Sequence, residues 1–122
     1  MTRSVLEGCR ILIVEDEYLI ATAFSLELAD QGASVVGPAP TVRHALSLID
    51  TGERLDLAVL DANVRGEPFH PIADLLAARA VPFLLVTGYD RNAIPARYQH
   101  LPILEKPVEA ATVVAALALL RS

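Results

Sequence analysis

LDLAVLDANVRGEP, residues 55–68, is an apolar run that ends abruptly at a carboxylate. Residues 57–60, with the β-branched Val59 among them, are typical of a strand buried on both faces. Asp61 follows at once, and open α/β sheets bind their ligands at the carboxyl ends of such strands. Two interpretations of this stretch alone are equally open: Asp61 is a reactive residue, or it simply begins a turn.

Short apolar runs recur on both sides of this stretch and alternate with helical patterns. The other predicted strands are residues 10–14, 33–37 (ended by Pro38 and Pro40), 81–87 and 101–104. The predicted helices are residues 18–31, a stretch capped by Thr41 and closed at 51–52, a stretch beginning at Pro71, a short or kinked piece within 90–100, and residues 108–120. Five strands alternating with five helices predict an α/β fold, a doubly wound parallel sheet covered on both faces.

Helical periodicity also predicts which faces are buried. The second helix has one apolar stripe, formed by Val42, Ala45, Leu46 and Ile49. In the first helix, Leu19, Ala23, Leu26 and Asp30 lie roughly at turn spacing and much of the segment is apolar, so no single buried face is predicted. The last helix is apolar nearly all round, which suggests a homodimer through this helix, or equally an Ala-rich helix with scattered exposed apolar side chains.

Composition restricts the classes of function. The 122 residues form one domain, with a core at about 9–121, and we expect no linker and no second domain. The net charge of −5 and the lack of a basic stripe argue against nucleic-acid binding. Cys9 has no partner for an internal disulfide and suits a buried position in a reducing compartment. No membrane span or signal peptide is evident, so we expect a cytoplasmic protein.

Polar residues end four of the predicted strands. Asp16, Asp61, Thr87 and Lys106 follow the first, third, fourth and fifth apolar runs, and the ends of parallel strands share one edge of a sheet. Glu15, Asp16 and Asp61 would crowd together there and repel one another unless a cation intervenes. Oxygen ligands without His or Cys suit a hard cation, and Mg²⁺ fits better than Ca²⁺, which needs more oxygens.

This set of side chains is suited to phosphoryl transfer. A carboxylate such as Asp61 can attack a phosphoryl group, while the metal ion and Lys106 neutralise the charge on that group. Thr87 could donate a hydrogen bond to a phosphoryl oxygen. The site therefore contains a nucleophile, metal ligands, a cation and a hydroxyl.

The same residues resemble the receiver domains of bacterial two-component response regulators. The matching motifs run in order along the chain: IVEDE (13–17), LDANVRGEP (60–68), VTGY (86–89) and LEKP (104–107). The resemblance implies a flavodoxin-like sheet with strand order 2-1-3-4-5. It also implies a phosphohistidine donor on a sensor kinase or phosphotransfer protein.

The resemblance assigns a role to each matching residue. Asp61 is the implied phosphoacceptor, and Glu15 and Asp16 are the implied acidic pair for Mg²⁺. The backbone carbonyl of Asn63 is a further implied ligand of the ion. Thr87 is the implied switch hydroxyl, and Lys106 is implied to pair with the phosphate. The bond from Lys106 to Pro107 is implied to be cis.

The chain also departs from the usual receiver pattern. Ile103 stands where receivers carry Tyr or Phe on the fifth strand, so the usual aromatic rotation is missing. LLVTGYD (84–90) is similar to a subgroup of single-domain receivers named FATGUY, which implies an HWE-type kinase partner. Tyr89 is predicted to shield the phosphoryl group or replace the moving aromatic, or else to be an ordinary tyrosine at the solvent edge. Residues 90–100, with weak patterning around Pro95, are predicted to respond to phosphorylation.

Three classes of function are compared. The first is a stand-alone receiver that catalyses only its own phosphorylation and slow dephosphorylation and then binds a downstream protein or drains phosphate. The second is a small metal-dependent phosphatase or phosphotransferase that uses the same Asp61 on small substrates. It would be expected to carry a general acid two residues later, where Asn63 stands. The third is a degenerate receiver, which would have lost the acceptor, the acidic pair or the lysine. The first class fits best.

Overall fold

A computed structural model describes residues 5–88 and 91–121 and centres on a buried parallel sheet. Its middle strand β3 (Leu57–Asp61) lies between β1 (Arg10–Val14) and β6 (Phe83–Thr87). The edge strands are β2 (Ser34–Ala39) and β7 (Ile103–Glu105). The order β2-β1-β3-β6-β7 confirms the expected 2-1-3-4-5 order, since β6 and β7 are the fourth and fifth of the predicted strands.

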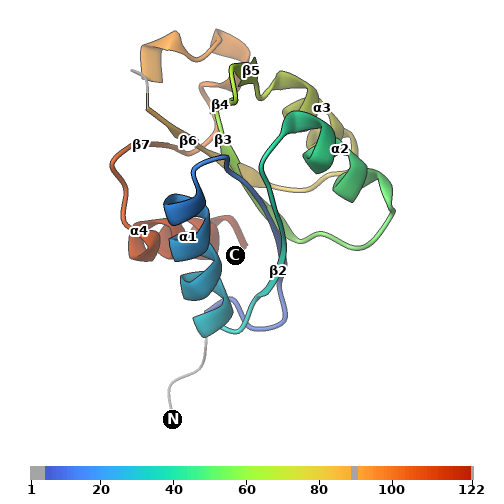
Figure 1. Cartoon of the computed structure of the whole chain (residues 1–122), viewed down its shortest axis with the longest axis vertical. Helices are drawn as coiled ribbons and strands as arrows, with labels where there is room; N and C mark the ends of the chain where they lie inside the picture. The colour runs from blue at the N-terminus through green and yellow to red at the C-terminus, as the bar shows by residue number, and fades with distance from the viewer. Residues whose placement is uncertain (1–4, 89–90, 122) are drawn as a thin grey trace.

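Helices cover both faces of this sheet, as Figure 1 shows. They are α1 (Tyr18–Asp30), α2 (Val42–Asp50), α3 (His70–Ala78) and α4 (Ala110–Arg121). The expectation of five helices is wrong for the described residues, where the remaining helical stretch is two 3₁₀ turns, η1 (Arg91–Ala93) and η2 (Ala96–Tyr98). Pro95 separates the turns, because it has no N–H to donate to a continuous helix.

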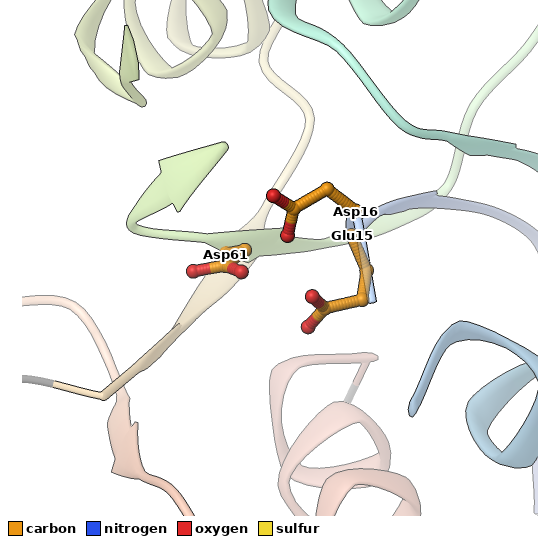
Figure 2. A group of neighbouring side chains, drawn as sticks. All are labelled: Glu15, Asp16 and Asp61. Carbon is orange, nitrogen blue, oxygen red and sulfur yellow. The ribbon is translucent and has the colours of Figure 1, made fainter. Parts of the chain in front are cut away.

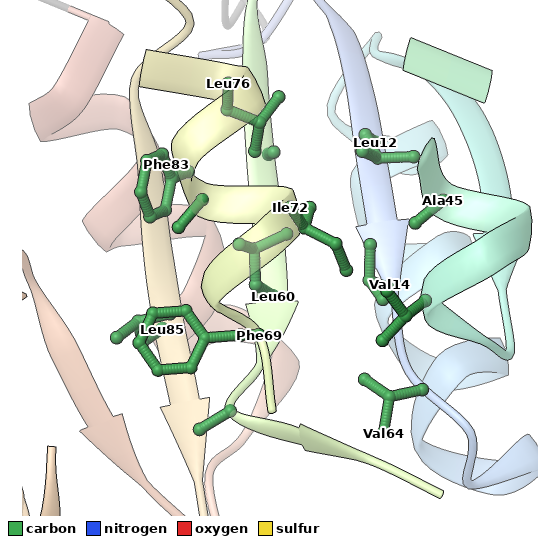
Figure 3. Close-up of a cluster of buried hydrophobic side chains, with 14 of the residues drawn as sticks. Leu12, Val14, Ala45, Leu60, Val64, Phe69, Ile72, Leu76, Phe83 and Leu85 are labelled. Carbon is green, nitrogen blue, oxygen red and sulfur yellow. The ribbon is translucent and has the colours of Figure 1, made fainter. Parts of the chain in front are cut away.

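Alternate residues of each strand supply two separate cores. Leu12, Leu60 and Leu85 point into the core that α2 and α3 cover, which Figure 3 shows. Ile13, Val59 and Leu84 belong to the opposite core with α1 and α4. This arrangement explains why β3 is apolar at every position before Asp61, since both of its faces are covered.

The buried face of α1 is not the row that shows turn spacing in the sequence. Leu19 and Leu26 are 81% and 68% exposed, whereas Ala21, Phe24 and Leu28 are buried. Both rows have helical spacing, and the helix is apolar nearly all round, so periodicity could not choose between them. In α2 the predicted stripe is confirmed, and Thr41 caps the helix by accepting a hydrogen bond from the His44 N–H at 3.0 Å.

Two local features were not expected. β2 continues through Pro38, which an edge strand tolerates because one side of its backbone needs no partner. A small antiparallel hairpin, β4 (Asn63–Val64) with β5 (Glu67–Pro68), follows Asp61. Its turn residues Arg65 and Gly66 both have positive φ, as tight hairpin turns require.

Cys9 is buried as predicted, and among the described residues no helix has the length and apolar character of a membrane span.

Gly37 lies where β2 packs closely beside the end of β1. Its φ is +91°, and a Cβ there would lie 2.7 Å from the Ala39 nitrogen. Gly52 has a similar φ of +81° but open space around it. We expect Gly52→Ala to lower the free energy of unfolding by about 1 kcal/mol, and Gly37→Ala to lower it by roughly 1–3 kcal/mol more because of the clash. Urea denaturation measures both values, and equal losses would contradict this description of β2.

Candidate functional site

Three carboxylates meet at the carboxyl edge of the sheet, as Figure 2 shows. Asp61 is the last residue of β3, and Glu15 and Asp16 follow the neighbouring strand β1 directly. One oxygen atom from each of the three side chains lies within 4.8 Å of the others. Asp61 and Glu15 are buried, and Asp16 is half-buried. The adjacency of β1 and β3 therefore concentrates negative charge at this edge.

Lys106 enters this group from the end of β7. Its Nζ lies 3.1 Å from Asp61 Oδ2, 3.1 Å from Glu15 Oε1 and 3.5 Å from Glu17 Oε1. The Lys106 N–H donates to the Thr87 carbonyl at 2.7 Å, which joins the ends of β7 and β6. The Lys106–Pro107 peptide bond is cis, as the resemblance implied. The ammonium is thus shared among several carboxylates.

Backbone N–H groups from the loop after β3 hold two of the carboxylates. Asp61 Oδ1 accepts from the Asn63 N–H at 3.1 Å, and Asp16 Oδ2 accepts from the Arg65 N–H at 3.0 Å. The Asn63 side chain accepts from the Gly66 N–H at 2.9 Å, which stabilises the turn of the hairpin. A cavity of about 320 Å³ opens beside these groups and is lined by Asp16, Glu17, Asp61, Asn63, Gly88 and Lys106.

The remaining candidate residues do not line this cavity in the described part of the chain. Thr87 ends β6 and is fully buried, opposite Glu105 in the register of β7. Ile103 is a buried core residue of β7, paired with Leu85. Tyr89 lies outside the described residues, so its proposed shielding role stays a prediction.

Burial and crowding change the ionisation of this group. Burial, and then the nearby Asp61 carboxylate, raise the pKa of Glu15 from 4.5 to about 7. Burial alone would lower the pKa of Lys106, but the carboxylates of Asp61 and Glu15 outweigh it and raise that pKa. Lys106 therefore stays charged, and Glu15 readily takes up a proton.

The donor set fits a hard divalent cation. Glu15 Oε1 is buried and, among the described residues, accepts no hydrogen bond, although it lies in ion-pair contact with Lys106. A buried acceptor of this kind is costly to leave unsatisfied. Three carboxylates without His or Cys match the oxygen ligands that Mg²⁺ and Ca²⁺ prefer.

Sequence reasoning missed one member of the site, Glu17. Its carboxylate lines the cavity and contacts Lys106, although it follows the predicted acidic pair by only one residue. The available signal was the third acidic residue of the IVEDE motif. Its side-chain direction, however, depends on how α1 begins, and the sequence does not reveal that.

Comparison with known proteins finds similar solved structures. No protein-family model matches the sequence, and none of the curated proteins does. The solution structure of SdrG from Sphingomonas melonis Fr1 is 40% identical, with a TM-score of 0.80 over 96% of this chain and 98% of that one. The BeF₃-activated conformation of SdrG from Pseudomonas melonis Fr1 is 37% identical, with a TM-score of 0.78 over 100% of both chains. A response regulator receiver protein from Sinorhizobium medicae WSM419, 24% identical over 95% and 96% of the two chains, shares the fold with a TM-score of 0.79.

The raised pKa of Glu15 predicts how stability depends on pH. Between pH 4.5 and about 7 the folded protein keeps a proton on Glu15 that the unfolded chain has lost. Because the folded state binds more protons, the free energy of unfolding should fall as pH rises through this window in a chelator, by up to about 3 kcal/mol. Glu15→Gln should remove this contribution.

Urea denaturation at several pH values between these limits measures the effect. Glu27→Gln removes an acid from α1 outside the site and should keep the wild-type pH dependence. If Glu15→Gln retained the full slope, the pH dependence would have to come from another group.

Proposed function

The chain belongs to the family of response regulator receiver domains, and on this premise we propose that Asp61 is the residue that accepts the phosphoryl group. The function of the chain is that of a phosphoacceptor in two-component signalling. One observation carries the assignment to Asp61. Its carboxylate ends the central strand beside the Lys106 ammonium and within reach of the other two acidic side chains.

The arrangement of Asp61 suits attack on phosphorus. An oxygen of its carboxylate forms a bond to the phosphorus of a phosphohistidine, and the P–N bond breaks as the imidazole leaves. The Asn63 N–H holds Oδ1 and orients the carboxylate. Lys106, already 3.1 Å from Oδ2, then pairs with a phosphoryl oxygen. Thr87, at the end of the adjacent strand, donates its hydroxyl to another oxygen.

The metal ion that fits this site is Mg²⁺. We propose Glu15, Asp16, Asp61 and the backbone carbonyl of Asn63 as the groups that hold it. When bound, Mg²⁺ neutralises charge on the phosphoryl group and on the crowded carboxylates. Its presence should also favour the ionised form of Glu15, whose pKa is otherwise raised.

The competing assignment is a small phosphatase that uses the same nucleophile. Such an enzyme needs a general acid beside Asp61, but the residue two positions later is Asn63, whose side chain is engaged in the hairpin turn. We therefore propose that the chain catalyses only its own phosphorylation and slow dephosphorylation. The donor is a sensor histidine kinase, HWE-type by the resemblance, or a phosphotransfer protein.

Oligomer formation through α4 also remains a proposal. Val113, Val114 and Leu117 pack against the sheet, whereas Leu119 is 79% exposed on the far side. A homodimer through this side of α4 would cover Leu119. The alternative is an Ala-rich helix with scattered exposed apolar side chains, which are common on protein surfaces. Sedimentation of the wild type and of Leu119→Glu at micromolar concentration distinguishes them.

We also propose that the 3₁₀ segment η1–η2 responds to phosphorylation. Tyr98 anchors it, since its ring packs edge-on against Phe69 at 4.8 Å and its hydroxyl donates to Asp74 Oδ1 at 2.8 Å. Phe69 in turn donates its N–H to the Ala62 carbonyl at 3.2 Å, one residue after Asp61. A change at Asp61 can therefore reach this segment through few contacts.

Phosphorylation of Asp61 can be tested with a small phosphodonor. With Mg²⁺ and acetyl phosphate, intact mass should show that the wild type gains one phosphoryl group and that Asp61→Asn gains none. Asp30→Asn, an exposed aspartate at the end of α1, is the matched control and should behave as the wild type. Equal labelling of Asp61→Asn and the wild type would place the acceptor elsewhere.

The anchoring role of Tyr98 predicts faster local opening when its hydroxyl is removed. Tyr98→Phe keeps the ring contacts but loses the hydrogen bond to Asp74, worth about 1 kcal/mol. The rate of amide hydrogen exchange over residues 91–101 should therefore rise about fivefold. Hydrogen-exchange mass spectrometry under native conditions measures this rate. Tyr18→Phe, at a tyrosine that is 79% exposed, should leave this exchange unchanged. The anchor is refuted if both variants exchange alike.

A further inference from the structure

Glu17 contacts the ammonium on which phosphoryl binding depends, yet the mechanism above gives it no role. Its Oε1 lies 3.5 Å from Lys106 Nζ, so Lys106 is shared among Asp61, Glu15 and Glu17. The first two carboxylates are buried, whereas the Glu17 side chain is 61% exposed. Glu17 therefore contacts the ammonium from the solvent side of the site.

The start of α1 determines where the Glu17 side chain lies. Glu17 is the N-cap residue of the helix, but its side chain forms no capping hydrogen bond. Its N–H donates to Glu15 Oε2 at 3.1 Å, which holds the backbone against the buried acid. The carboxylate, not engaged by the helix, instead lines the cavity beside Asp61 and Lys106.

This position places a negative charge where a phosphoryl donor must enter. A donor that approaches Asp61 brings further negative charge into the cavity and needs the Lys106 ammonium that Glu17 also contacts. We propose that Glu17 is a positioning residue that acts through Lys106: it holds the ammonium toward the cavity mouth and disfavours small phosphodonors in proportion to their negative charge. The inference rests on the proposed function of Asp61.

The effect of replacing Glu17 on the rate of phosphorylation should be modest and sensitive to salt. Exposed ion pairs contribute little to stability, and their field is screened at physiological ionic strength. Neutralising Glu17 should therefore raise the rate of phosphorylation by a dianionic donor by about twofold to fivefold at low salt. A monoanionic donor should gain less, and Glu17→Lys should extend the same trend.

Two donors of different charge test the proposal. Acetyl phosphate is dianionic near pH 8 and releases acetate as its phosphoryl group bonds to Asp61, whereas phosphoramidate is monoanionic and releases ammonia. With Mg²⁺ present, the phosphorylation rates of the wild type, Glu17→Gln and Glu17→Lys are followed by intact mass at low and high salt. Glu27→Gln, on the same helix, is the control for net charge. A purely structural role of Glu17 would change both donor rates alike.

The outcomes separate this inference from the proposed function. The quantity compared is the ratio of the acetyl phosphate rate to the phosphoramidate rate. The inference is supported if this ratio rises from the wild type through Glu17→Gln to Glu17→Lys and if the rise becomes smaller in high salt. If the wild type is phosphorylated but the ratio is the same in all variants, or changes equally in Glu27→Gln, the inference is overturned and the function of Asp61 stands. A wild type that neither donor phosphorylates overturns both.

Discussion

The contact of one ammonium with several carboxylates at the edge of the sheet is the constraint on which the rest of the site depends. Lys106 neutralises only part of the charge of Asp61 and Glu15, and burial together with the nearby Asp61 carboxylate raises the pKa of Glu15. A folded protein keeps such a surplus only if burial elsewhere offsets its cost. On the proposed function, this surplus would favour a divalent cation, whose charge would in turn offset that of the incoming phosphoryl group.

The order of the strands in the sheet brings these charges together. β1 and β3 are neighbours in the sheet although α1, β2 and α2 lie between them in sequence, so Asp16 and Asp61 end adjacent strands. Both faces of the middle strands are covered, and the two cores hold the strands in register. Within β1, β3 and β6, charged residues stand only at strand ends, Arg10 at the start of β1 and Asp61 at the end of β3, and the site lies at the carboxyl ends.

The parts of the fold that could be predicted from the sequence are those marked by an abrupt local change from apolar to polar residues. An apolar run that stops at Asp61 or at Thr87 marks the end of a strand, and both strands end at these residues. The buried face of α1 could not be predicted, because Leu19 and Phe24 are equally apolar and only the packing of the sheet distinguishes them. Lys106 could be placed in the site because it directly follows a strand.

Other features depend on contacts between distant parts of the chain. Tyr98 comes from a segment with weak patterning, and its partner Asp74 lies 24 residues earlier, on α3. The hairpin after Asp61 depends on two residues with positive φ, and Gly66 gives a local signal for this whereas Arg65 gives none. Glu17 was missed because the sequence neighbours of the acidic pair can point in any direction at the start of a helix.

Position 103 carries isoleucine, so β7 has no aromatic ring there that could move in response to the site. Ile103 and Tyr98 belong to the same buried cluster. In this part of the core the aromatic ring is that of Tyr98, which comes from η2, whereas β7 contributes the aliphatic Ile103. An aromatic ring on β7 could respond to Thr87 directly, since the two strands are paired. Tyr98 instead contacts Phe69, which follows the hairpin that carries Asn63 and Arg65. If phosphorylation of Asp61 acts on η2 as proposed, the loop after β3 offers a path, because that loop both holds the carboxylate and leads into the residue on which Tyr98 packs.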